Sequence, residues 1–202
     1  MIKKIKSIFF KLILIIQGAK IGKNFSCENL PKITLIKTSK LNLILGDGVI
    51  FSGKVEIKIR DESSIKISNN VKVDQGVRIN VANESKIQIG SNSKVMFYSQ
   101  INAGADIYIG SYSALSSHST LTSSSHLYKL RENFLKTDYL HKSVFIGDNV
   151  HIGIGTFVSP GTKVDSNIIV GPVSYVNKDL LDQNSYYNGN PIKKIYSLEE
   201  NS

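Results

Sequence analysis

The 202-residue sequence contains a single cysteine, Cys27, and no tryptophan. One cysteine cannot form a disulfide within the chain, which is compatible with a reducing cytoplasm. Acidic residues are missing from the first 23 positions, which contain six lysines. Those lysines supply +6 of the net charge of +9, so the rest of the chain carries an ordinary +3. Because basic residues are not interleaved with aromatic ones in the repeats that follow, we expect no nucleic-acid partner.

The sequence also lacks an apolar run of the ~20 residues needed to span a bilayer. Its most apolar stretch, residues 1–18, is interrupted by Lys11 and ends in QGAK, a poor signal-peptidase site, so secretion is not expected. This stretch is predicted to be a basic amphipathic helix, with its lysines opposite one apolar face. The predicted apolar face consists of Ile2, Ile5, Ile8, Phe9, Leu12, Ile13, Ile15 and Ile16, whereas Phe10 and Leu14 fall outside it.

What the sequence does have is a strict repeat. Between Val144 and Val176 an aliphatic residue recurs every six positions, followed each time by a small or turn-forming residue. Helices repeat apolar side chains at three and four, and strands repeat them at two, so this period fits neither. It fits a unit made of a short strand followed by a corner. Three such units form the sides of one triangular coil of about 18 residues. The inward positions are Ile146, Ile152, Val158, Val164, Val170 and Val176.

The same spacing extends backwards and predicts an all-β fold over residues 21–179, a parallel β-helix of about seven coils. The earlier triplets are Ile21/Cys27/Ile33, Leu45/Phe51/Ile57, Ile67/Val73/Ile79, Ile89/Val95/Ile101 and Ile109/Leu115/Leu121. Between the last of these and Val144 the repeat lapses. We therefore expect residues 122–143 to form one extruded loop, with a short helix around 130–135, and residues 180–202 to form a C-terminal tail.

Two roles remain open for the N-terminal helix, which we place at residues 1–20. As a cap, it covers the end of the β-helix, which would otherwise offer an edge for further strand pairing. As an anchor, residues 1–18 lie on the anionic inner leaflet of the cell membrane, which makes a cytoplasmic protein peripheral to that membrane. One helix could serve both roles.

Four parts of the chain resemble the left-handed β-helix acyltransferases of the hexapeptide-repeat superfamily, closest to the maltose/galactoside and capsule O-acetyltransferases. They are the repeat itself, IGSYSALSSHSTLTSSSH (109–126), IGDNVHIGIGTFVSPGTKV (146–164) and GNPIKKI (189–195). The left-handed sense is taken from this resemblance, because the period does not fix the hand. The resemblance implies a homotrimer that transfers an acetyl group from acetyl-CoA to a hydroxyl of a bacterial surface glycan or its sugar precursor.

In that family the general base is a histidine at the start of the extruded loop, at a fixed distance after the glycine of the preceding IG. Gly110 is that glycine here, and His126 lies sixteen residues after it. The chemistry calls for such a base, since a sugar hydroxyl is a poor nucleophile and a neutral imidazole can remove its proton. The resemblance therefore implies direct transfer within a ternary complex, with His126 as the base.

Candidates for acceptor binding are Asn102, His118, Arg131 and His151. His151 stands where members of the family usually have Trp. The chain also lacks the close histidine pair of the zinc-binding carbonic anhydrases that share this coil, so we expect no metal site.

For the coenzyme, Gly153 and Gly171 allow its arm to approach the backbone closely. Pro172, where family members have a small residue, has no N–H to donate to that arm. Lys178, Lys193 and Lys194 are candidate partners for the coenzyme's phosphates.

The acceptor chemistry stays open at this stage. N-acetylation of an amino sugar, or of a drug such as chloramphenicol, fits the same motifs. Outside enzymes, the alternative is a structural β-helix without catalysis. The outward positions lack the regular threonine ladder of ice-binding β-helices, and an extruded histidine loop has no purpose in that alternative.

Overall fold

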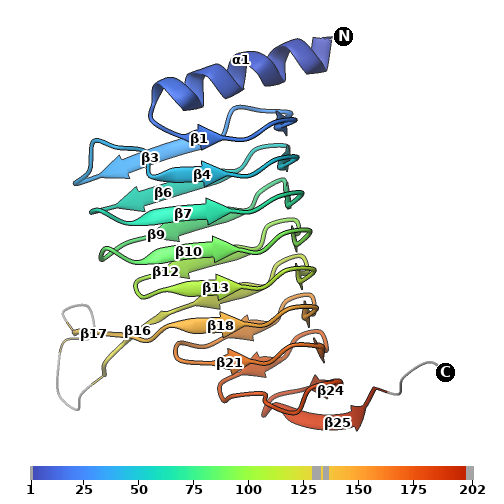
Figure 1. The fold of residues 1–202 in the computed structure, drawn as a ribbon. Helices are drawn as coiled ribbons and strands as arrows, with labels where there is room; N and C mark the ends of the chain where they lie inside the picture. The colour runs from blue at the N-terminus through green and yellow to red at the C-terminus, as the bar shows by residue number, and fades with distance from the viewer. Residues whose placement is uncertain (1, 129–132, 134–136, 199–202) are drawn as a thin grey trace.

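The computed structural model describes residues 2–128, 133 and 137–198. It shows a column of seven triangular coils, with a helix across one end and a strand hairpin across the other (Figure 1). The coils wind in the left-handed sense (Figure 1). Each coil contributes one strand to each of three sheets, and the strands stacked within the coils are parallel. The predicted all-β solenoid of about seven coils is confirmed.

The strands fall into the three sheets in strict rotation. Sheet A contains β1 (Lys20–Ile21), β4 (Leu43–Leu45), β7 (Ser64–Ile67), β10 (Lys86–Ile89), β13 (Ile107–Ile109), β18 (Val144–Ile146) and β21 (Lys163–Val164). Sheet B contains β2 (Ser26–Cys27), β5 (Ile50–Ser52), β8 (Lys72–Asp74), β11 (Lys94–Val95), β14 (Ala114–Leu115), β19 (His151–Ile152), β22 (Ile168–Val170), β24 (Ser185–Asn188) and β25 (Lys193–Ser197). Sheet C contains β3 (Lys32–Ile36), β6 (Glu56–Arg60), β9 (Arg78–Val81), β12 (Gln100–Ala103), β15 (Thr120–Thr122), β20 (Phe157–Val158) and β23 (Tyr175–Val176).

The predicted inward residues form ladders along the column. In sheet A, for example, Leu45 pairs with Ile67, which pairs with Ile89. All of these predicted residues are buried except Ile21 and Ile33 in the first coil, which are half-buried against the core. β-branched side chains suit this surface because their restricted rotamers pack well on a pleated strand. The period missed a second inward residue on the longer strands, two positions earlier, as at Leu43, Ile65 and Ile87.

Asparagines turn many of the corners between sheets A and B. Asn70, Asn92, Asn149 and Asn167 have φ values of 56°, 60°, 53° and 59°. Asparagine tolerates this left-handed region because its short side chain forms local hydrogen bonds. Stacked corners are also joined: Asn70 Nδ2 donates to Asn92 Oδ1 at 3.3 Å, and Asn149 Nδ2 donates to Asn167 Oδ1 at 2.9 Å. These ladders keep successive coils in register.

Helix α1 (Ile2–Ile16) lies across the first coil (Figure 1). It packs there through Ser7, Phe10 and Leu14, of which Leu14 is fully buried. The contact face is therefore not the predicted apolar face, most of which points to solvent. Polar contacts explain part of this choice: Ser7 Oγ accepts from the Cys27 N–H at 3.1 Å and lies 3.3 Å from the Phe25 carbonyl, to which it donates. The helix thereby satisfies backbone groups at the edge of the first coil.

At the other end, β24 extends sheet B by pairing in parallel with β22, and β25 returns antiparallel to β24. Residues 180–202, expected as a tail, thus include two further strands. Tyr187 and Ile192 from this segment are buried against the last coil. Within the part of the chain that the structure describes, no helix is long and apolar enough to cross a bilayer.

Candidate functional site

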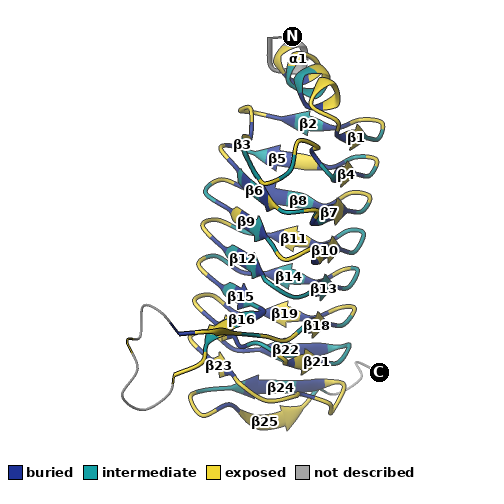
Figure 2. Cartoon of the chain, turned by 90° about the vertical axis from the view of Figure 1, so that its left-hand side faces the viewer, coloured by how far each residue is buried: buried dark blue, intermediate teal, exposed yellow. Residues whose placement is uncertain are grey.

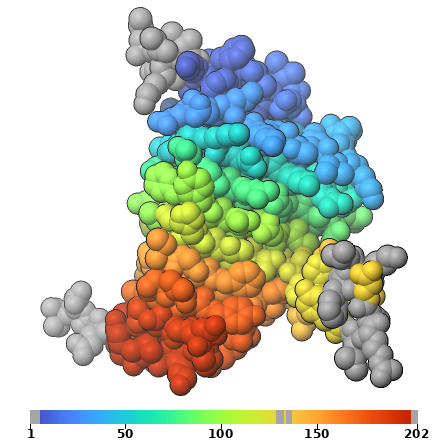
Figure 3. Space-filling model, turned by 180° about the vertical axis from the view of Figure 1, so that it is seen from behind, coloured from blue at the N-terminus to red at the C-terminus, as the bar shows by residue number. Residues whose placement is uncertain are grey.

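One segment leaves the column where the repeat lapses. After β15, strand β16 (Ser124–His126) pairs antiparallel with β17 (Tyr139–His141), and the coils resume at β18. This hairpin protrudes from the corner that joins sheets C and A (Figures 1 and 3). Residues 129–132 and 134–136, which include Arg131 and most of the expected short helix, lie outside the described residues.

His126 ends β16 and is half-buried. Its Nδ1 lies 3.1 Å from Oγ1 of Thr137, a residue with only 7 % of its surface exposed. The imidazole also packs on Tyr139, with 4.3 Å between ring centroids. When Nδ1 carries the ring proton and donates it to Thr137, Nε2 keeps its lone pair, which is the form that a general base requires.

A polar cleft of about 580 Å³ lies on sheet C beside the hairpin. Strands β6, β9 and β12 form its floor, and β6 and β9 contribute Lys58, Arg60 and Arg78. Arg78 Nε lies 3.4 Å from Glu56 Oε2, so the excess positive charge of the cleft comes from Lys58 and Arg60. Asn102, on β12, also faces it, and its Oδ1 accepts a hydrogen bond from Asn80 Nδ2 at 2.7 Å. The cleft has the size of a small-molecule site, and its charge suits an anionic ligand.

His141 lines the same cleft, although the sequence analysis did not single it out. Its Nδ1 lies 2.9 Å from Ser124 Oγ, and its Nε2 lies 3.2 Å from Asn83 Nδ2. Because an amide NH₂ only donates, Nε2 accepts from Asn83, and Nδ1 donates to Ser124. Both ring nitrogens are therefore engaged, whereas His126 has one hydrogen-bond partner among the described residues. His141 holds the hairpin in place, and His126 is the better base.

The two remaining histidines lie on other parts of the coils. His118 is exposed at a corner between sheets B and C, where its ring stacks on Tyr98 with 5.3 Å between centroids. His151 is exposed on β19, and its Nε2 lies 3.1 Å from Ser116 Oγ. Neither lines the cleft, and His126 does not line it either, although Ser124 and Tyr139 of the same hairpin do. In a triangular coil, sheet B is also the side opposite the corner from which the hairpin leaves.

Gly153 and Gly171 are required by the stacking of the coils. A Cβ on Gly153 would lie 2.6 Å from the carbonyl carbon of Gly171, and a Cβ on Gly171 would lie 2.3 Å from the Tyr186 hydroxyl. The backbone groups of Gly171 are already used, because its N–H donates to Tyr187 and its carbonyl accepts from Thr156 Oγ1. A coenzyme arm would therefore meet these glycines through van der Waals contact rather than through their hydrogen bonds.

The candidate phosphate-binding lysines lie at the C-terminal end of the column. Lys178 and Lys193 are exposed, and Lys194 Nζ lies 3.4 Å from Asp182 Oδ2. These charges are far along the chain from the cleft beside the hairpin, which they do not line. The residues predicted from the sequence to bind substrate or coenzyme therefore fall into two groups. One group lies at the hairpin, and the other lies on sheet B and at the C-terminal end of the column.

Solved structures are similar to this chain over most of its length, although no protein-family model and no curated protein sequence matches it. AntD, an N-acyltransferase from Bacillus cereus in complex with dTDP and 3-hydroxybutyryl-CoA, is 20% identical with a TM-score of 0.63, covering 94% of this chain and 88% of its own. A maltose O-acetyltransferase from Clostridium difficile 630 is 25% identical with a TM-score of 0.51, covering 67% of each chain. NeuO, a polySia specific acetyltransferase, is 17% identical with a TM-score of 0.51, covering 92% of this chain and 90% of its own.

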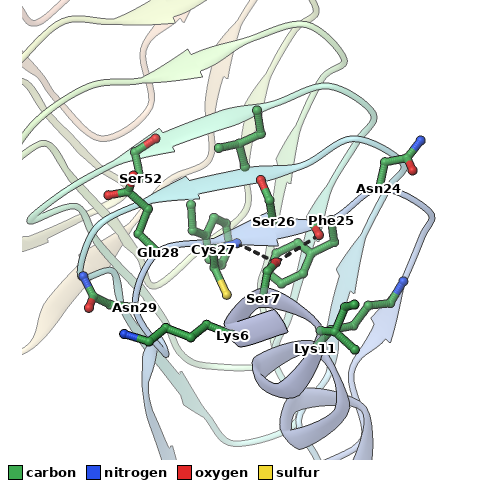
Figure 4. Close-up of a pocket in the computed structure, with 13 residues that line it drawn as sticks. Lys6, Ser7, Lys11, Asn24, Phe25, Ser26, Cys27, Glu28, Asn29 and Ser52 are labelled. Atoms are coloured by element: carbon green, nitrogen blue, oxygen red, sulfur yellow. Dashed lines mark hydrogen bonds between the residues drawn. The ribbon is translucent and has the colours of Figure 1, made fainter. Parts of the chain in front are cut away.

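The fold is that of the left-handed β-helix acyltransferases. A cavity larger than the cleft beside the hairpin lies at the N-terminal end of the column. It measures about 820 Å³ and lies between α1 and the first coil (Figure 4). Phe25, Cys27 and Phe51 line it together with Lys6 and Lys11, and no histidine does. The Glu28 carboxylate also lines this cavity. We place the candidate site at the hairpin because the imidazoles of His126 and His141 lie there.

Proposed function

We propose that this protein is an acyltransferase that moves an acetyl group from acetyl-CoA to a hydroxyl of a bacterial surface glycan or of its sugar precursor. The observation that carries the proposal is the imidazole of His126, held on Thr137 at 3.1 Å in a hairpin that borders a cationic cleft. The comparisons support the reaction class, since AntD and the maltose O-acetyltransferase are both acyltransferases.

His126 acts as the general base in this proposal. Its Nε2 accepts the proton of the acceptor hydroxyl while that oxygen attacks the thioester carbon of the donor. The carbon–sulfur bond then breaks, and the imidazolium returns the proton to the departing thiolate of coenzyme A. A positioned base of this kind contributes a factor of about 10²–10⁴. Thr137 contributes by orienting the ring, and its hydroxyl accepts from Nδ1–H in the tautomer that leaves Nε2 unprotonated.

The cleft binds the acceptor. Lys58, Arg60 and Arg78 favour an acceptor that carries a phosphate or a carboxylate, because clustered cations attract and orient such groups. Asn102 and His141 offer further polar contacts to its hydroxyls. Two similar proteins accord with this choice: an AntD variant was solved with dTDP-4-amino-4,6-dideoxyglucose and coenzyme A, and NeuO is specific for polysialic acid. Arg131 and His118 remain additional acceptor candidates.

We further propose a homotrimer in which acetyl-CoA lies between adjacent columns. His151, Gly153 and Gly171 lie on or beside sheet B, away from the hairpin of their own chain. A site that combines them with His126 therefore needs a second copy. In that arrangement Lys178, Lys193 and Lys194 bind the coenzyme's phosphates. A stable monomer at micromolar concentration, measured by light scattering, would contradict this assembly.

N-acylation is the second candidate, and the similarity to AntD favours it. A neutral amine needs the same proton removal after it attacks, so the hairpin fits either reaction. The two differ only in the acceptor, which an assay with matched hydroxy and amino sugars distinguishes.

The test is thiol release from acetyl-CoA with sugar phosphates, nucleotide sugars, acidic sugars and amino sugars, together with mass spectrometry of the product. We expect turnover with at least one anionic acceptor, and a loss of at least ~100-fold in kcat for His126→Ala. His141→Ala serves as the matched histidine variant and is expected to raise KM more than it lowers kcat. An unchanged kcat for His126→Ala would remove His126 from the role, and no turnover with any acceptor or acyl chain would favour the non-catalytic β-helix.

A further inference from the structure

The outer face of α1 exposes a continuous apolar surface. Its residues Phe9, Leu12, Ile15 and Ile16 have exposed fractions of 59%, 54%, 42% and 84%. Ile8, which is 56% exposed, lies at the edge of this face and also lines the cavity between α1 and the first coil. These positions lie on one side of the helix, because at 100° per residue they fall within an arc of about 120°. A large contiguous apolar patch on a protein surface marks a site of interaction rather than a packing accident.

The position of this face is fixed by the opposite side of the helix. Leu14 is fully buried in the first coil, and Ser7 bonds to backbone groups of Phe25 and Cys27. Lys11 Nζ also donates to the Gly22 carbonyl. The helix is therefore held in one orientation at the end of the column, and exposed residues lie along it there (Figure 2). It cannot turn its apolar face inward without breaking these contacts.

The positive charge near α1 indicates which kind of surface its apolar face binds. The first 23 residues carry six lysines and no acidic residue, and Lys6 on the helix and Lys20 and Lys23 on the first coil are exposed. An anionic surface complements this arrangement, and an interface between two copies would bring two such lysine clusters together. An apolar helical face bordered by lysines is the form that binds in the boundary between lipid headgroups and acyl chains.

We propose that α1 docks this protein on an anionic phospholipid membrane. The helix lies in the plane of the surface, with Ile8, Phe9, Leu12, Ile15 and Ile16 in the apolar boundary and the lysines at the headgroups. At 15 residues it does not span the bilayer. Because the helix lies across the end of the column (Figure 1), the coils and the hairpin project from the membrane. The same helix therefore covers the first coil with one face and binds lipid with the other.

The test is co-sedimentation of the full chain with vesicles of phosphatidylcholine alone and of phosphatidylcholine with phosphatidylglycerol. We expect pelleting with the anionic vesicles and little with the neutral ones. The double variant Phe9→Ser/Leu12→Ser should lose binding at least tenfold. Leu181→Ser, which removes an apolar residue 53% exposed at the other end of the column, should bind like the parent. Retained protection of Cys27 from alkylation shows that α1 stays in place in each variant.

Charge is tested separately with Lys6→Gln/Lys23→Gln, which should weaken binding about 30-fold at low salt, since each lysine near such a surface contributes a factor of about five. The matched control is Lys66→Gln/Lys86→Gln on the outer side of sheet A. No binding to anionic vesicles, or equal binding by the Phe9/Leu12 variant, would overturn the proposal. A drop in oligomer mass for that variant, without any vesicle binding by the parent, would assign the face to a second copy instead.

Discussion

The two ends of the column are closed in different ways. At the N-terminal end, α1 crosses the first coil and reaches its backbone with side chains, as Ser7 does at the Cys27 N–H. At the C-terminal end, β24 continues the hydrogen-bond ladder of β22, and β25 then runs antiparallel with all of its residues exposed. The helix ends strand pairing, whereas the hairpin moves the edge of sheet B two strands outward.

This difference shows why a helix is suited to the N-terminal end. A strand used as a cap has one role, because the same few residues both pair with the coil and cover its core. A helix has several faces, so α1 can satisfy the coil with Ser7 and Leu14 and still present Phe9 and Leu12 to a surface. Variants on each face of α1 therefore test the two roles separately.

Deletion of residues 2–16 should have the largest effect. It uncovers the first coil, leaving Phe25 and Cys27 exposed beside an unpaired strand edge, which is a template for aggregation. We expect aggregated protein, or a column that unfolds at a much lower temperature, in size-exclusion chromatography and thermal denaturation. A monodisperse protein with the thermal stability of the parent would show that the coil needs no cover.

Substitution of single leucines should separate the two faces of α1. Leu14→Ala removes a fully buried side chain, so we expect a loss of about 2–5 kcal/mol in the free energy of unfolding. Leu12→Ala changes a side chain that is 54% exposed, and a change within ~0.5 kcal/mol is expected. Denaturant unfolding of the two variants measures the contrast. Equal losses would mean that the helix does not pack as described.

Ser7→Ala should have a smaller effect than Leu14→Ala. The change leaves the Cys27 N–H without its side-chain acceptor at a buried position, which costs about 1–3 kcal/mol. Ser26→Ala is the control, since this side chain is only half-buried on the neighbouring position of β2. The same unfolding experiment gives the result, and a Ser7→Ala variant as stable as Ser26→Ala would argue against the polar contact.

The smallest effect is a pH dependence at Cys27. Burial beneath α1 raises the pKa of the thiol from 9.0 to about 11, while the hydrogen bond with Ser7 lowers it by less. The unfolded chain therefore releases this proton more readily, so the contribution to stability is complete below pH 9.0 and is lost as the pH rises towards about 11. We expect the parent to lose more stability than Cys27→Ala between pH 8 and about 10.5 in parallel unfolding curves. Parallel losses would leave the thiol without a role.

The column itself could be predicted from the sequence, because one inward residue per side repeats without interruption from Ile146 to Val176. A repeat of this kind is a local property of the sequence, so it predicts the coil without knowledge of tertiary contacts. The face of α1 could not be predicted in the same way. Hydrophobicity groups Phe9 with Leu12, but which face packs depends on the shape and polar edge of the first coil, where Leu14 and Ser7 fit.

Only the part of the candidate site that follows from the spacing of residues along the sequence could be predicted. His126 follows Gly110 at a distance that the sequence states, and it lies in β16, which pairs with β17 in the hairpin; its role stays a prediction. His141 could not be found this way, because it faces Ser124 through a strand pairing whose register nothing local specifies. The cationic floor was missed for a related reason, since Arg60 and Arg78 belong to different coils that meet only in the folded column.

The most direct test of the central claim, that the coils are scaffold and the hairpin holds the chemistry, is excision of the hairpin. The Lys142 N–H donates to the Ser123 carbonyl at 2.9 Å, so residues 124–141 can be replaced by a short glycine linker between two points already in contact. Acetyl-CoA turnover and thermal unfolding are then measured on the same preparation. We expect a folded column with stability near that of the parent and no measurable acyl transfer. Turnover equal to that of the parent would contradict it.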